Sequence, residues 1–170
     1  DNGTTAMTGH QHHPATGFTA KGEPAPKLDL EAVCAASGAR AVRVVDPYDL
    51  AAVERALREA LEGPKPSVVI SRRACLLSPA ARQAVAAAGG VGGAAGGAGA
   101  AHAPGVVSVD ADACADCGEC LSLGCPALHR SDDGVTAVDR LLCSACGMCV
   151  QVCPTGALKP PTGEEGGAQR

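Results

Sequence analysis

The chain has 170 residues, enough for one domain of ordinary size or two small ones. Hydrophobic residues make up 46% of it but aromatic residues only 1%, so we expect a thin core and regard the ten cysteines as further stabilising elements. The net charge of −4 argues against nucleic-acid binding. No apolar run reaches the length of an ordinary transmembrane helix, and no secretory signal opens the chain. We therefore expect a cytoplasmic protein without a membrane partner.

Composition and charge divide the chain into four segments. Residues 1–79 hold nine basic and nine acidic side chains. Residues 80–105 are rich in Ala and Gly, which predicts a flexible linker. Residues 106–159 contain eight of the ten cysteines, and together with residues 160–170 they carry a net charge of −5. The composition of residues 160–170 predicts a disordered tail.

The first segment predicts part of an α/β domain. Helical periodicity predicts helices at 28–36 and 50–61, and short apolar runs predict strands at 41–46 and 67–70. This order of strand, helix and strand predicts a parallel pair with a right-handed crossover. Two strands do not form a free-standing sheet, and the chain starts at Asp1 without a Met. We therefore expect a piece of a longer protein, incomplete on its N-terminal side.

Eight cysteines form two matching runs, which constitute an internal repeat of about 29 residues. Their patterns are C-x2-C-x2-C-x4-C-P and C-x2-C-x2-C-x3-C-P. The second pattern is that of bacterial ferredoxins with two [4Fe–4S] clusters, in which the fourth cysteine of a run ligates the other cluster. The predicted ligands of one cluster are Cys114, Cys117, Cys120 and Cys153, and those of the other are Cys143, Cys146, Cys149 and Cys125.

The same segment predicts a small α+β, bacterial two-cluster ferredoxin-like domain. Strands are expected at 106–109 and 136–138, one at the start of each repeat. Structural zinc is the weaker alternative, because it would leave the third evenly spaced cysteine of each triplet without a use. Disulfides are weaker still in a chain without a secretory signal. Two cysteines lie outside the runs: Cys34 is interpreted as a small buried side chain, and for Cys75 a packed and an exposed position are both left open. Neither is assigned a nucleophilic role, since the sequence indicates no base partner.

The opening segment DNGTTAMTGHQHHPATG is rich in side-chain oxygens, glycines and histidines. Oxygen donors suit Mg²⁺, and glycine lets the backbone approach a phosphate. A solvated polar segment in which the histidines occur by chance is the alternative interpretation.

Four stretches together resemble the large (alpha) subunit of the indolepyruvate ferredoxin oxidoreductases, in the 2-oxoacid:ferredoxin oxidoreductase family. They are the opening segment, VRVVDPYDL at 42–50, SVVISRRAC at 67–75 and the two cysteine runs. The resemblance covers nearly the whole chain except the Ala/Gly segment and the last ten residues. It implies that residues 1–79 are the C-terminal part of a thiamine-diphosphate-binding domain and that 106–159 are the two-cluster domain.

The resemblance also implies a site for thiamine diphosphate and Mg²⁺. By position, Asn2 would bind Mg²⁺ through its side chain and Thr4 through its backbone carbonyl. Met7, Thr8 and Gly9 would lie beside the cofactor. His10 is interpreted as a buried or hydrogen-bonded histidine, and a position facing the substrate pocket is the alternative. No catalytic residue is assigned.

The implied reaction of the complete enzyme is oxidative decarboxylation of indolepyruvate or another aryl 2-oxoacid. Coenzyme A would receive the acyl group, ferredoxin the electrons, and a smaller (beta) subunit would be a partner. The chain by itself is expected to be inactive in decarboxylation. A stand-alone dicluster electron carrier with a remnant of the thiamine domain is the alternative, and an iron–sulfur sensor is a third interpretation that no residue favours.

Overall fold

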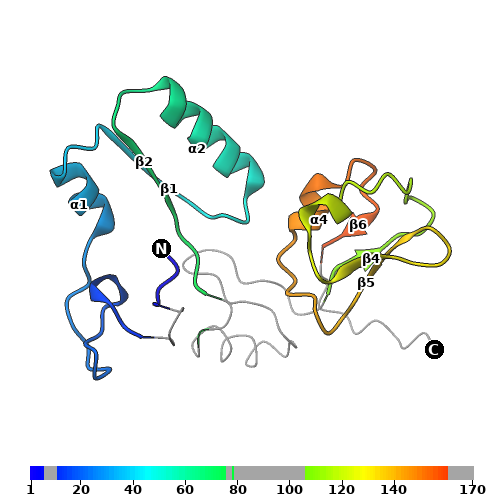
Figure 1. Ribbon diagram of the computed structural model, residues 1–170, viewed down its shortest axis with the longest axis horizontal. Helices are drawn as coiled ribbons and strands as arrows, with labels where there is room; N and C mark the ends of the chain where they lie inside the picture. Colours follow the sequence, from blue (N-terminus) through cyan, green and yellow to red (C-terminus); the bar gives the residue numbers. More distant parts are fainter. Residues whose placement is uncertain (6–10, 76–77, 79–105, 161–170) are drawn as a thin grey trace. The chain divides into compact units, whose positions relative to one another are not determined.

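The structure is a computed structural model that describes residues 1–5, 11–75, 78 and 106–160 (Figure 1). The chain divides into two compact units, Asp1–Ser78 and Pro79–Arg170. The predicted linker at 80–105 and nearly all of the predicted tail lie outside the described residues. Within the described ranges, no helix is long and apolar enough to cross a membrane.

The first unit is built on a parallel β–α–β element (Figure 1). Strand β1 (Ala41–Val45) pairs in parallel with β2 (Ser67–Ser71), in a register that runs from Ala41 opposite Ser67 to Val45 opposite Ser71. Helix α2 (Leu50–Glu62) connects them and packs against both strands. Helix α1 (Leu30–Ala36) packs against β1. The predicted parallel pair is therefore confirmed.

Aspartates set the boundaries of these elements. The Asp29 carboxylate accepts a hydrogen bond from the Ala32 N–H at 3.0 Å, so α1 begins at Leu30 rather than at residue 28 as predicted. Asp49 caps α2 in the same way, accepting from the Ala52 N–H at 2.8 Å. The Asp46 carboxylate accepts from the Tyr48 N–H at 2.9 Å, which starts a turn and ends β1 one residue before the predicted boundary.

The core of the first unit is thin, as the composition predicts. Its described buried hydrophobic residues are Ala15, Ala56 and Ile70. Leu57 and Leu61 belong to the predicted apolar stripe of α2 but are 49% and 73% exposed. A sheet of two strands is too narrow to cover the whole apolar side of a 13-residue helix.

The second unit repeats one pattern of elements twice: a strand, a cysteine triplet, a short helix, a Cys-Pro pair and a strand. The first copy contains β3 (Ser108–Val109), η2 (Leu121–Leu123) and β4 (Leu128–Arg130). The second contains β5 (Thr136–Val138), α4 (Met148–Val152) and β6 (Leu158–Lys159). The predicted strand at 136–138 is confirmed, and the strand predicted at 106–109 is shorter than expected.

Two antiparallel strand pairs hold this unit together. The first strand, β3, pairs antiparallel with the last, β6. Strands β4 and β5 form an antiparallel pair between the two copies (Figure 1). The buried residues gather in one cluster of small and apolar side chains, made of Val107, Cys120, Ala127, Cys143, Cys149 and Leu158. Cysteines thus occupy positions that large hydrophobic residues fill in other small domains.

Candidate functional site

The two cysteine triplets have the same unusual backbone. The residue before the middle cysteine is left-handed in both, with φ of 51° at Asp116 and 54° at Ala145. The glycine after it is left-handed as well, with φ of 77° at Gly118 and 73° at Gly147. Alternation of right- and left-handed residues turns successive N–H groups toward one point and forms a concave site for anions, iron–sulfur clusters included. Both loops therefore have a backbone suited to a negatively charged cluster.

The first cysteine set comprises Cys114, Cys117, Cys120 and Cys153. The structure brings these four together as the lining of one pocket, which Thr136 and Thr155 also line. Three of the cysteines come from the first run and the fourth comes from the second. These are the four residues that the sequence predicts for one cluster.

Hydrogen-bond donors surround the sulfurs of the first cysteine set. Backbone N–H groups of Thr136 and Asp116 lower the pKa of the Cys114 thiol. Partial burial raises the pKa of Cys153, but donors on Leu158, Thr155 and Ala157 outweigh it and lower that pKa to about 7. The Thr136 hydroxyl lies 3.4 Å from the Cys120 sulfur. Such donors stabilise thiolates, the form in which cysteine binds metal.

The second cysteine set comprises Cys143, Cys146, Cys149 and Cys125. Burial raises the pKa of the Cys149 thiol to about 11, and the charges of nearby thiolates act in the same direction, those of Cys146, Cys143 and Cys125. Cys125 therefore lies near the second triplet although it belongs to the first run. The charges of these thiolates repel one another, and bound iron would offset that repulsion.

Within the described part of the chain, no three His, Cys, Asp or Glu side chains gather closely enough to bind a single metal ion. In a [4Fe–4S] cubane each of four irons takes its own thiolate. The donor chemistry and the curved backbone of both sets fit such a cluster.

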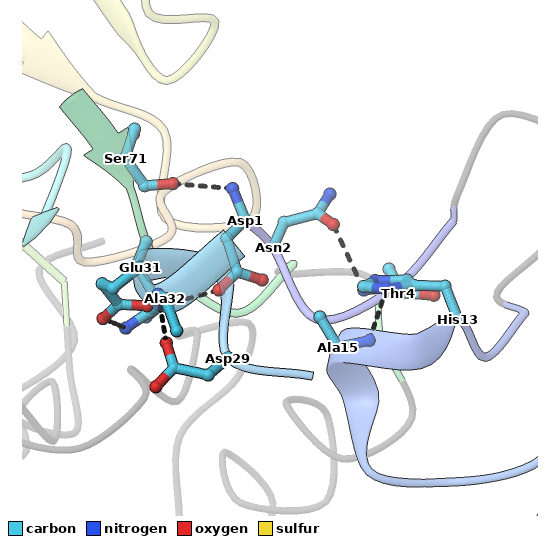
Figure 2. Close-up of polar contacts among 10 residues, drawn as sticks. Asp1, Asn2, Thr4, His13, Ala15, Asp29, Glu31, Ala32 and Ser71 are labelled. Carbon is cyan, nitrogen blue, oxygen red and sulfur yellow. Dashed lines mark hydrogen bonds and ion pairs between the residues drawn. The ribbon is translucent and has the colours of Figure 1, made fainter. Parts of the chain in front are cut away.

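A second candidate site lies in the first unit, beside the carboxyl end of β2. An open pocket of about 500 Å³ is found there, lined by Asp1, Asn2, His13, Leu30, Pro47, Ile70, Ser71 and Arg73. Ligand sites of parallel sheets lie at this edge. Asn2 is thus placed at a pocket, and its side-chain oxygen, which accepts from the Thr4 N–H at 3.2 Å, is of the type that Mg²⁺ prefers (Figure 2).

The backbone holds Asn2 at this place. The Asp1 amino group donates to the Ser71 carbonyl at 2.8 Å (Figure 2). The Arg73 N–H donates to the Asp1 carbonyl at 3.0 Å. The Cys75 N–H donates to the Asn2 carbonyl at 2.9 Å. The opening residues therefore follow the end of β2 in a parallel arrangement. Asn2 fits a role as one oxygen ligand of Mg²⁺.

The structure describes only some of the other residues near the predicted thiamine diphosphate site. Thr4 follows Asn2 by two residues and donates through its hydroxyl to the Gln11 carbonyl at 3.4 Å. Met7, Thr8, Gly9 and His10 lie outside the described residues. His13 accepts from the Ala15 N–H at 3.2 Å through Nδ1, which caps the short helix η1 (Pro14–Thr16) (Figure 2).

Comparison with known protein families gives one match in each of the two units. The "Thiamine pyrophosphate enzyme, C-terminal TPP binding domain" family matches residues 1–71, and the "4Fe-4S binding domain" family matches residues 136–159. Six curated relatives match the chain, and all six are named indolepyruvate oxidoreductase subunit IorA. That of Methanothermobacter marburgensis is 38% identical over 161 residues, 94% of this chain and 23% of the relative. The chain is homologous to the IorA subunits.

Two further IorA subunits give the same result. That of Pyrococcus horikoshii is 38% identical over 161 residues, 94% of this chain and 22% of the relative. That of Archaeoglobus fulgidus is 42% identical over 77 residues, 45% of this chain and 12% of the relative. The chain thus spans about a quarter of the length of the IorA subunits it matches. No solved structure is significantly similar to it. The family resemblance drawn from the sequence is confirmed.

The sequence analysis did not single out the twin arginines that follow β2. Arg72 pairs with the Asp1 carboxylate at 2.7 Å and with both oxygens of Glu31, at 2.8 and 2.7 Å. Its hydrogen bond lowers the pKa of Glu31 to about 2. Arg73 pairs with Asp46 and lies 4.0 Å from the centre of the Tyr48 ring. The only signal in the sequence was that these residues lie in the stretches shared with the IorA family.

Proposed function

We propose that this chain is the electron-transferring C-terminal part of an oxidoreductase that oxidatively decarboxylates indolepyruvate or another aryl 2-oxoacid. The acyl group would pass to coenzyme A and the electrons to ferredoxin. The observation that carries the proposal is the gathering of Cys153 with the first triplet around one pocket. Homology to the IorA subunits supports the choice of substrate class.

The proposed cofactors of the chain itself are two [4Fe–4S] clusters. The first cysteine set would hold one and the second cysteine set the other, so that each run supplies a ligand to the other run's cluster. Clusters of this kind carry single electrons. The left-handed loops around Cys117 and Cys146 would turn N–H groups toward the clusters and stabilise their negative charge.

Thiamine diphosphate with Mg²⁺ is the proposed cofactor of the complete enzyme, and it supplies the carbanion chemistry of decarboxylation when bound. Asn2 and the Thr4 carbonyl would contribute to the Mg²⁺ shell, with Met7, Thr8 and Gly9 beside the cofactor. This shell needs about six oxygens, more than these residues provide. We therefore propose that the isolated chain does not decarboxylate. The resemblance to the family supports a smaller (beta) subunit as a partner in the complete enzyme.

Anaerobic reconstitution tests the cluster proposal. The chain should take up about eight irons and eight sulfides, as two cubanes require, and its visible absorbance should bleach with dithionite. Stoichiometric zinc without sulfide in anaerobically isolated protein would contradict the proposal.

The thiamine proposal needs the complete subunit. There, Asn2→Ala should weaken Mg²⁺-dependent binding of thiamine diphosphate, measured by calorimetry, and leave the cluster spectrum unchanged. Asn2→Asp, which keeps a side-chain oxygen, is the matched control and should retain binding. Equal binding by Asn2→Ala and the unaltered subunit would remove Asn2 from the site.

A further inference from the structure

The internal repeat allows the surroundings of the two cysteine sets to be compared position by position. A shift of 29 residues places residues 107–120 on 136–149, so that Cys114, Cys117 and Cys120 correspond to the second triplet. Under this shift Val107 corresponds to Thr136. Both are buried, with 3% and 6% of their surface exposed. The two side chains have nearly the same shape, and they differ in that a hydroxyl replaces a methyl group.

The Thr136 hydroxyl faces a sulfur of the first cysteine set. Thr136 lines the same pocket as this set, and its Oγ1 lies 3.4 Å from the Cys120 sulfur. A sulfur bound to iron carries no proton and only accepts, so in the loaded protein the hydroxyl must be the donor. Val107 lies in the buried cluster of the unit, which contains Cys120 as well as Cys143 and Cys149, and its side chain has no donor. The repeat relates the Thr136 and Cys120 pair to Val107 and Cys149.

We propose that Thr136 is a tuning residue: its hydroxyl raises the reduction potential of the cluster in the first cysteine set, and Val107 leaves the other cluster without this contribution. The inference rests on the proposed function, which places clusters in both sets. One-electron reduction adds a negative charge to a cluster. A hydroxyl that donates a hydrogen bond to a ligand sulfur stabilises the reduced cluster, which is the more negative one. The hydrogen bond therefore favours reduction and raises the potential.

Exposed charged side chains also influence the cluster potentials, through long-range electrostatics rather than a buried hydrogen bond. Asp116 is half-exposed and paired with Arg130, and Arg140 and Glu119 are exposed. Their influence on a cluster is screened by salt, with a Debye length of about 3 Å at 1 M. The contact between Thr136 and Cys120 is buried, so its contribution should persist when salt has suppressed the exposed charges.

Redox titration of the anaerobically reconstituted full chain at high salt tests the proposal. We expect Thr136→Val to lower one of the two midpoints and leave the other in place. A hydrogen bond of ordinary strength changes the ratio of reduced to oxidised cluster about fivefold, which is about 40 mV for a one-electron couple at 59 mV per tenfold. Thr136→Ser, which keeps the hydroxyl, should retain the original midpoint.

The reverse substitution provides a second test. Val107→Thr should raise the midpoint that Thr136→Val leaves unchanged. The proposal is wrong if Thr136→Val moves neither midpoint, or moves both equally, or if Thr136→Ser gives the same shift as the valine. Iron and sulfide are counted in each variant. Fewer than two clusters in the unaltered chain would contradict the proposed function, whereas two clusters with unmoved midpoints would contradict this inference alone.

Discussion

The turn that leads into Cys114 and the turn that leads into Cys143 have similar backbones and different surfaces. Asp110 accepts the Ala113 N–H at 3.2 Å, and Asp139 accepts the N–H groups of Leu141 and Leu142 at 2.8 and 3.4 Å. Between aspartate and cysteine the first turn has Ala-Asp-Ala and the second has Arg-Leu-Leu. Leu141 is 92% exposed.

Features that recur in both copies of the repeat lie around the cysteines. The capping aspartates, the left-handed residues and the buried alanines Ala127 and Ala157 recur in both copies, because they shape the loops that hold the sulfurs. Side chains that point away from the sulfurs differ freely. The Thr136 and Val107 pair is an exception, since this difference lies inside the unit.

The largest expected effect is the loss of one cluster when the fourth cysteine of either run is replaced. Cys153→Ser should damage the cluster bound by the first triplet, and Cys125→Ser should damage the cluster bound by the second. Each variant should retain about four of eight irons, measured by iron and sulfide analysis, with electron paramagnetic resonance identifying the remaining cluster. If each serine damages the cluster of its own run, the crossed arrangement is wrong.

Substitution of the glycine after each middle cysteine tests whether both loops require a left-handed residue there. Gly118→Ala and Gly147→Ala should each destabilise the loaded chain by about 1 kcal/mol, because an L side chain is strained at positive φ. The space around either glycine would admit a Cβ, so strain and not collision is the cause. Anaerobic thermal loss of the cluster absorbance measures this.

The exposed neighbour Glu119 provides the control for these glycines. Glu119→Ala should change stability by less than about 0.5 kcal/mol. A large effect at only one of the two glycines would show that the loops are not equivalent.

Removal of the capping aspartates sharpens the comparison of the turns. Asp139→Ala should cost about 1 kcal/mol, since its carboxylate accepts two N–H groups. Asp110→Ala should cost less, because that carboxylate accepts one at 3.2 Å. Thermal melts of both variants test the order, with the exposed Asp132→Ala as control. An equal loss in all three would exclude a capping role.

The smallest expected effect lies in the first unit, where an ion pair joins residues that are distant in the chain. The Arg72 hydrogen bond lowers the pKa of Glu31 from its ordinary 4.5 to about 2. The contribution of this pair to stability is therefore present above pH 4.5 and is lost as the pH falls toward 2. Melts of Glu31→Gln and the unaltered chain should converge across this interval. A constant difference would contradict the prediction.

Local patterns determined much of this protein from its sequence alone. The helix at 50–61, the parallel pair and the repeat of cysteine triplets were evident because periodicity and ligand spacing act within a few residues of the chain. The aspartate caps moved the element ends by one or two residues, since competing side-chain hydrogen bonds terminate helices and strands. The resemblance to the family followed from the order of four such local stretches.

Contacts between distant residues were decided by the tertiary structure. Pairing of β3 with β6 joins residues about 50 positions apart in the chain. Arg72 and Arg73 follow the end of β2, and this position brings them to partners that are distant in the chain. These partners are Asp1, Glu31 and Asp46. The position of Thr136 against Cys120 likewise depends on how the two repeats pack. Spacing along the chain names the chemical groups, but packing brings them within bonding distance, because no local rule relates residues that meet only in the folded state.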